Sequence, residues 1–221
     1  MVDTPLYPVA LMLAGKSCLV VGGGPVAARK IRSLVHCGAL VTVVAPQISA
    51  DIEKMEGIRI ELRSYDPGEA RNYRLVFAAT SQRELNHLIY QDAESAGIFA
   101  NTADDPQACS FMLPSVIRQD PVTVAVSTSG ASPALAVWLR NILAGFVGQE
   151  HAAMAELLSQ ARQELHTQGR SSESVNWSEL LEGDLPSLVR SGRIEDARKL
   201  VEKVSDVELA ERAGVLNCSP L

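Results

Sequence analysis

Three small residues near the start of the chain have the spacing of a phosphate-binding turn. Gly22, Gly24 and Ala27 fit the pattern G-x-G-x-x-G/A, in which backbone N–H groups at a helix end hold the diphosphate of a dinucleotide. The first glycine permits a tight turn, the second lets the backbone approach the phosphates, and the alanine lets the helix lie close to the strand. Pro25 suits the first turn of that helix, where its missing N–H costs little. The same pattern also occurs as a plain strand-to-helix turn in doubly wound sheets, and this alternative stays open.

The acidic residue that usually accompanies such a turn is missing. In most nicotinamide-binding sheets an Asp or Glu at the end of the second strand holds the adenosine ribose. Here the segment APQ (45–47) follows the expected strand, and Asp51 lies too far along the chain to replace that acid. Arg29 and Lys30 follow the glycine turn. They could attract phosphates or carboxylates, or they could lie on a solvated helix face.

A repeating pattern of strands and helices must position these residues. Val- and Leu-rich stretches at 18–21 and 40–44 predict buried strands, and residues 25–37 predict the helix between them, ended by Gly38. The pattern continues with a helix at 51–56, strands at 59–62 and 75–79, a helix at 82–96 and a strand at 98–102. Ser81 and Glu84 have the spacing of a capping box at the start of the 82–96 helix. This order predicts an α/β fold with a Rossmann-like, mainly parallel sheet covered on both faces.

The pattern changes after Pro106. Two strands at 110–118 and 122–127 flank Pro121, which argues against one continuous central strand. Ser132 can cap a helix that begins at Pro133. Farther along, the sequence predicts only helices, at 152–168, 177–181, 185–191 and 195–204. We therefore expect three parts: a dinucleotide-binding domain (1–113), a small strand–helix region (114–148) and a helical C-terminal domain (149–221).

Composition excludes several classes of function. The 221 residues carry a net charge of −6, which argues against nonspecific nucleic-acid binding. The four cysteines contain no C-x-x-C pair and the four histidines show no metal-ligand spacing, so we expect neither a bound metal nor a disulfide framework. The start of the chain lacks a basic leader, and no stretch is long enough to span a membrane. These features favour a protein of the reducing cytoplasm.

Six short motifs occur in order and together resemble one family. They are VVGGGPVAARK (20–30), VVAP (43–46), AAT (78–80), NTADDP (101–106), SFMLPS (110–115) and VAVSTSGASP (124–133). The chain thereby resembles the siroheme synthase family, whose members are precorrin-2 dehydrogenases and, in some cases, also sirohydrochlorin ferrochelatases. Members commonly carry Ala-Pro in place of the acid after the second strand. The resemblance covers roughly residues 5 to 148 and extends more weakly into the helical tail.

The resemblance implies an NAD-dependent oxidation of precorrin-2 to sirohydrochlorin in siroheme biosynthesis. The nicotinamide accepts a hydride and a base accepts a proton. The family's key acid matches Asp104, which could take that proton or accept pyrrole protons during insertion of ferrous iron, a substrate of chelation. From the residues alone, an Asx-turn before Pro106 is the favoured role of Asp104. The resemblance also implies a homodimer formed through the region after Pro114.

Matching positions carry the family's cofactor contacts onto this chain. The resemblance places the diphosphate at Gly22, Gly24, Pro25 and Val26, the adenosine near Pro46 and Gln47, and the nicotinamide side along Thr80, Asn101 and Thr102. Substrate carboxylates are expected at the turn Ser127, Thr128, Ser129 and Gly130 and at Arg118 and Arg140. Thr128 matches a serine that is phosphorylated in some members. The turn could also be an ordinary helix cap.

A second class of function stays open at this point. A nucleotide-sensing regulatory module that performs no chemistry would also need the glycine turn. It would leave Asp104, the serine-rich turn and the helical tail unexplained. Turnover of precorrin-2 with NAD separates the two hypotheses.

Overall fold

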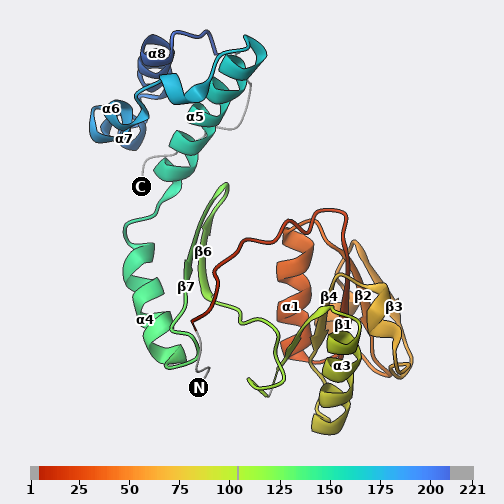
Figure 1. Ribbon diagram of the computed structural model, residues 1–221. Helices are drawn as coiled ribbons and strands as arrows, with labels where there is room; N and C mark the ends of the chain where they lie inside the picture. Colours follow the sequence, from red (N-terminus) through yellow and green to blue (C-terminus); the bar gives the residue numbers. More distant parts are fainter. Residues whose placement is uncertain (1–4, 104, 210–221) are drawn as a thin grey trace. The chain divides into compact units, whose positions relative to one another are not determined.

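The computed structural model describes residues 5–103 and 105–209 (Figure 1), which divide into two compact units. The first unit comprises Met1–Leu113 with Ser129–Ala131, and the second comprises Pro114–Thr128 with Ser132–Leu221. The predicted 149–221 domain lies within the second unit, and its separation from 114–148 stays a prediction. None of the described helices combines the length and the apolar character needed to cross a bilayer.

A five-stranded parallel sheet forms the centre of the first unit. Its strands lie in the order β3-β2-β1-β4-β5, and all four pairings are parallel. The strands are β1 (Ser17–Val21), β2 (Leu40–Val44), β3 (Ile58–Glu61), β4 (Leu75–Ala78) and β5 (Phe99–Thr102). The chain first adds β2 and β3 on one side of β1. It then crosses to the other side of β1, where β4 and β5 pair. The predicted parallel sheet is confirmed, and the reversal of strand order between β1 and β4 marks the edge where open sheets bind ligands.

Helices cover both faces of this sheet. Neighbouring side chains of a buried strand point to opposite faces, so each strand contributes apolar residues to both. On one face Val20 packs in a cluster with Ile31 of α1 (Pro25–His36), and α2 (Ala50–Glu53) contributes to the same cluster. On the other face Leu19 packs with Ile89 of α3 (Arg83–Ser95) and with the 3-10 helix η1 (Glu69–Asn72). The side chains of Leu19, Ile31 and Ile89 are fully buried. Burial of each one stabilises the fold by about 1.5–3 kcal/mol.

The second unit contains a hairpin, one helix packed on it and a cluster of short helices. Strands β6 (Ser115–Gln119) and β7 (Val122–Val126) pair antiparallel around a cis Asp120–Pro121 bond. Helix α4 (Pro133–Ala144) packs against both strands. The predicted cap is confirmed, since Leu135 N donates to Ser132 Oγ at 3.2 Å.

The remaining helices share an apolar core of their own. They are α5 (Gln149–Thr167), α6 (Trp177–Glu182), α7 (Leu185–Arg190) and α8 (Ile194–Ser205), while the 3-10 helix η2 (Ser172–Ser174) after α5 adds no buried residue. Leu157, Leu165 and Leu185 lie fully buried in this core. The chain therefore places a third, separate hydrophobic cluster after α4, as expected for a helical tail.

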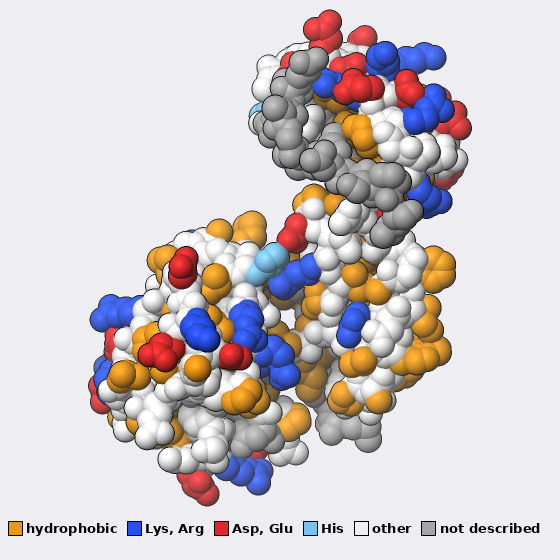
Figure 2. Space-filling model, turned by 180° about the vertical axis from the view of Figure 1, so that it is seen from behind, with side chains coloured by type: hydrophobic (Ala, Val, Ile, Leu, Met, Phe, Trp, Pro, Cys, Tyr) orange, Lys and Arg blue, Asp and Glu red, His pale blue; other side chains and the backbone are white. Residues whose placement is uncertain are grey.

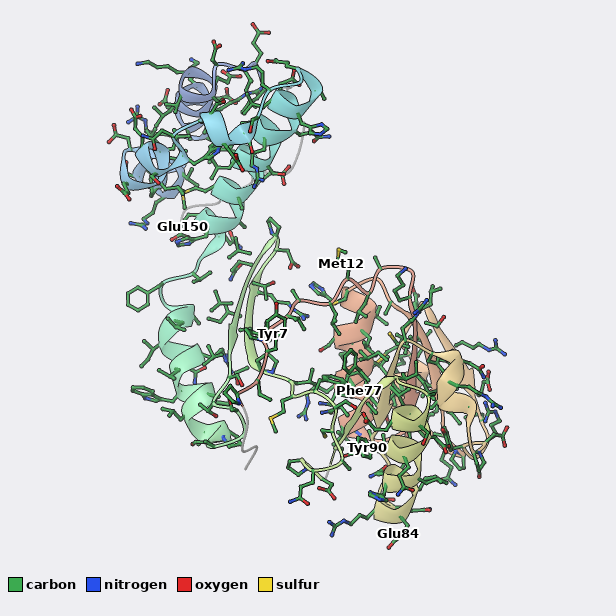
Figure 3. All side chains as sticks on the ribbon, in the orientation of Figure 1. Tyr7, Met12, Phe77, Glu84, Tyr90 and Glu150 are labelled. Atoms are coloured by element: carbon green, nitrogen blue, oxygen red, sulfur yellow. The ribbon has the colours of Figure 1, made fainter. Side chains whose placement is uncertain are left out.

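Two local expectations are wrong. The predicted strand at 110–118 begins only at Ser115, because Ser110 N donates to Ala100 O at 2.8 Å and so belongs to the edge of the first sheet. The predicted capping box of Ser81 and Glu84 is absent, since Gln82 is the N-cap of α3 and no side chain caps it. Glu84 is exposed at the beginning of this helix (Figure 3).

Candidate functional site

The first glycine of the turn lies where only glycine fits. Gly22 has φ +129°, and a Cβ at this position would lie 2.6 Å from the carbonyl carbon of Ala79. Its N–H donates to Val44 O at 2.9 Å. The backbone after β1 is thus pressed against the connection that follows β4, and any side chain here strains the turn.

Gly23, which the G-x-G-x-x-A pattern leaves free, is equally constrained. A Cβ on Gly23 would overlap the carbonyl oxygen of Gln47 and lie 2.8 Å from its carbon. In addition, Ser49 N donates to Gly23 O at 2.8 Å. The turn is therefore clamped between the connection after β2 and the connection after β4.

The third glycine faces open space. A Cβ on Gly24 would meet no atom within 4 Å, and Gly24 is the N-cap of α1 with no side chain bonded to the helix end. Pro25 occupies the first helical position and the first turn contains no acidic residue. The N–H groups that follow Gly22 in this turn, together with the partial positive charge of the helix end, form a cradle for an anion. These residues fit a dinucleotide diphosphate.

Other residues predicted for the cofactor surround this cradle. Val26 is 38% exposed at the start of α1. Pro46 and Gln47 are exposed in the connection after β2, which is the connection that contacts Gly23. Their contacts with an adenosine stay a prediction.

Lys30 is less solvated than a surface position on α1 would be. Its ammonium lies 5.5 Å from the ring centroid of Phe77, which β4 contributes (Figure 3). Burial lowers the pKa of Lys30, and the neighbouring Arg29 lowers it further. Phe77 also makes an edge-to-face contact with Phe111. Lys30 is therefore half-buried beside the Phe77 ring, whereas Arg29 is exposed.

Thr80 lies at the end of β4 beside the turn and is fixed by a buried amide. Asn86 Oδ1 accepts from Thr80 N at 3.1 Å and from Thr80 Oγ1 at 2.7 Å. Asn86 Nδ2 donates to Thr80 O at 3.1 Å. Asn86 is only 1% exposed. Both backbone groups of Thr80 thus take their partner from one side chain of α3.

The loop after β5 is closed by side chains that were predicted to lie along the cofactor. Asn101 Nδ2 donates to Phe111 O at 3.0 Å, and Thr102 Oγ1 donates to Asp105 O at 2.7 Å. The thiol of Cys109 accepts from Thr102 N at 3.3 Å. Asn101 and Thr102 therefore shape the loop through their side chains, and their contact with a nicotinamide stays a prediction.

Asp104, the predicted acid, lies outside the described residues. Its neighbour Asp105 accepts from Gln107 N at 2.9 Å and from Arg83 Nη2 at 3.2 Å. The Gln107 N–H and then the Arg83 guanidinium hold the pKa of Asp105 below its usual range. Asp105 is therefore an ionised, hydrogen-bonded part of the loop and a poor proton acceptor at neutral pH.

The serine-rich turn before α4 has an unusual backbone. Ser129 (φ +51°) and Gly130 (φ +80°) are both left-handed. Thr128 Oγ1 accepts from Ser132 N at 3.1 Å and donates to Ser132 O at 3.0 Å. The Thr128 hydroxyl thus helps close the turn, which supports the helix-cap alternative for part of it. Its role toward a substrate, and that of Ser127, stay predictions.

The two predicted arginines belong to the second unit. Arg118 is exposed on β6 and Arg140 is half-buried on α4. Within 5–103 and 105–209, no group of three or more His, Cys, Asp or Glu side chains could hold a metal ion.

Sequence reasoning missed Gly23 and Asn86. The run of three glycines is a signal for Gly23, because one glycine more than the dinucleotide pattern requires implies a second close backbone approach. Asn86 offers a weaker signal, a polar amide on the otherwise apolar face of a predicted helix.

Two protein families match successive parts of the chain. Residues 9–115 match the family described as "Putative NAD(P)-binding", and residues 119–145 match "Sirohaem biosynthesis protein central". The chain is 34% identical over 200 residues to the siroheme synthase of Nitrosococcus oceani, covering 88% of this chain and 43% of the relative. It is 35% identical over 211 residues to that of Thioalkalivibrio sulfidiphilus, covering 93% and 43%.

A solved structure resembles most of the chain. The structure titled "SirC, precorrin-2 dehydrogenase" superposes with a TM-score of 0.69 at 26% sequence identity, covering 90% of this chain and all of that one. The chain spans less than half of the length of the curated relatives above, whereas it spans the full length of this structural neighbour.

Proposed function

We propose that the chain is a member of the siroheme synthase family and that it oxidises precorrin-2 to sirohydrochlorin with NAD as the hydride acceptor. The observation that carries this proposal is the open cradle at Gly24, which lies at the edge between β1 and β4 where such sheets bind ligands. The neighbour of full matching length is titled a precorrin-2 dehydrogenase.

We infer that the dinucleotide is NAD, with no phosphate on the adenosine ribose. Sites for the phosphorylated form usually supply an arginine after the second strand, and residues 45–48 (APQI) contain none. Arg32, on α1, is already paired with Asp51 Oδ2 at 3.0 Å.

The chain's own residues would act in three places. The turn Gly22–Gly24 and the first N–H groups of α1 bind the diphosphate. The Thr80 turn forms a wall beside that turn. Asp104 accepts the proton that leaves precorrin-2. When bound, the nicotinamide supplies the hydride acceptor, so one oxidation yields sirohydrochlorin, NADH and a proton.

The polycarboxylate substrate needs cationic or N–H-rich partners. We propose the turn 127–130, Arg118 and Arg140 for that role. Insertion of ferrous iron into sirohydrochlorin, with Asp104 accepting pyrrole protons, is proposed as a second activity because some members of the family perform both reactions.

A homodimer formed by the second unit belongs to the same proposal. Hydrophobic side chains gather over the part of this unit that holds α4 (Figure 2). Trp138 is 57% exposed and Phe146 70%, and large apolar side chains exposed together are typical of an interface. A cytoplasmic location belongs to the same proposal, since Cys18 and Cys109 form no disulfide within the described residues.

The decisive assay mixes the purified protein with precorrin-2 and NAD and follows NADH and sirohydrochlorin by absorbance. Equal amounts of both products are expected. Tight NAD binding without any turnover would refute the oxidation and favour the nucleotide-sensing module. A second arm adds ferrous ions to sirohydrochlorin, and a rate equal to that without protein would remove the chelatase activity.

A further inference from the structure

The side chain of Asn86 replaces the strand partner that Thr80 lacks. Thr80 lies two residues after Ala78, the last residue of β4, so its backbone has left the sheet. Asn86 Oδ1 accepts from Thr80 N at 3.1 Å, and Asn86 Nδ2 donates to Thr80 O at 3.1 Å. The amide therefore binds both backbone groups of one residue, as a neighbouring strand would do. Asn86 is 1% exposed, so these hydrogen bonds are shielded from water.

The segment that Asn86 holds is the wall of the glycine turn. A Cβ on Gly22 would lie 2.6 Å from the carbonyl carbon of Ala79 and 3.2 Å from Thr80 N. Any displacement of the Ala79–Thr80 peptide toward β1 would therefore move Gly22, and a displacement away would leave the turn without support. The same wall continues into the next residues, since Gln82 N donates to Thr80 Oγ1 at 3.1 Å.

We propose that Asn86 is a positioning residue for the dinucleotide, holding the Thr80 turn so that the cradle of Gly22 to Gly24 has its binding shape before the ligand arrives. This inference rests on the proposed function, in which that cradle holds the NAD diphosphate. A preformed site binds more tightly because less ordering accompanies binding. In this proposal Asn86 acts by holding the Thr80 backbone.

The test compares Asn86→Ala and Asn86→Asp with Ile89→Ala. Asn86→Asp keeps the shape of the side chain and the Oδ1 atom that accepts from Thr80 N. It replaces Nδ2 by an oxygen, so only the hydrogen bond to Thr80 O is lost. Ile89 lies on the same helix, is fully buried, and belongs to the apolar cluster on that face of the sheet. Its truncation destabilises the unit without touching Thr80. NAD affinity is measured by titration calorimetry and stability by urea unfolding.

The Asn86 variants are expected to weaken NAD binding about tenfold or more, the equivalent of about 1.4 kcal/mol, with the loss appearing in KM for NAD more than in kcat. Ile89→Ala is expected to lose stability and keep the wild-type NAD affinity. Asn86 variants that bind NAD as wild type does would overturn the inference, and so would an Ile89→Ala variant that loses the same affinity. Absence of NAD binding by the wild-type protein would instead overturn the proposed function, and with it this inference.

A measurement on the unmutated protein decides the case if the Asn86 variants do not fold. Hydrogen exchange of the Thr80 amide is followed by NMR without ligand. Slow exchange, comparable to that of the β4 amides, is expected because the amide is already bonded to Asn86. Exchange as fast as that of an exposed loop would show that the turn is not held before binding.

Discussion

Replacing Gly24 by aspartate should weaken NAD binding without changing the stability of the fold. A Cβ at this position would meet no atom within 4 Å, and its φ of −92° is accessible to every residue. Aspartate is also a favoured N-cap, and exchanging it with glycine there changes stability by only a few tenths of a kcal/mol. We therefore expect Gly24→Asp to unfold at the same urea concentration as the wild-type protein.

Binding should respond in the opposite way. The new carboxylate would occupy the space at the first turn of α1 and cap the N–H groups that the diphosphate needs. Loss of two charge-assisted hydrogen bonds costs about 3 kcal/mol or more, which raises Kd for NAD at least about 100-fold. Repulsion between the carboxylate and the phosphates adds to this loss.

Titration calorimetry with NAD is the assay, and Asn176→Asp is the matched control. Asn176 is the N-cap of α6 and has no side-chain bond to that helix, so the control adds the same charge at a helix start in the second unit. The control should bind NAD as the wild-type protein does. A folded Gly24→Asp protein with wild-type affinity would refute the assignment of the cradle.

Four further predictions concern other parts of the chain. Gly23→Ala should lower the free energy of unfolding by about 2 kcal/mol or more, because its Cβ overlaps the connection after β2; an unchanged urea midpoint would contradict that contact. Burial raises the pKa of Cys18 from 9.0 to about 11, so the thiol of the unfolded protein ionises at a lower pH than that of the folded protein. The free energy of unfolding should therefore fall as the pH rises between these two values, by up to about 1.4 kcal/mol per pH unit. Cys18→Ala should remove that difference in a pH series of unfolding curves. Asp104→Asn should reduce kcat for precorrin-2 about 100-fold or more while leaving the calorimetric Kd for NAD nearly unchanged, and wild-type turnover would exclude it as the base. Trp138→Asp should sediment as a monomer, whereas Leu181→Asp, which changes another exposed apolar side chain, should sediment as the wild-type protein does.

Much of the first unit could be predicted from local patterns. The apolar strand, glycine turn and helix from β1 to α1 depend on neighbouring residues, and the predicted strand at 40–44 matches β2 residue for residue. Gly23 could not be assigned in the same way, because its constraint comes from Gln47, which only the folded sheet brings beside it.

The start of α3 shows why a local signal can fail. Ser81 and Glu84 have capping-box spacing, yet the fold leaves them unused. Asn86, one turn into the helix, binds Thr80 instead, and a contact between a helix interior and the preceding strand end leaves little trace in sequence spacing. At the serine-rich turn, the cap by Ser132 was predictable from its position before Pro133, whereas the left-handed backbone at Ser129 was not.

The apolar core of helices α5–α8 and the two apolar clusters of the parallel sheet have no buried residue in common. Cooperative melting requires shared contacts, so heating should disassemble the two interiors as distinct calorimetric events. In evolutionary terms, substitutions in the core of α5–α8 can accumulate without loosening the apolar clusters that hold the sheet together.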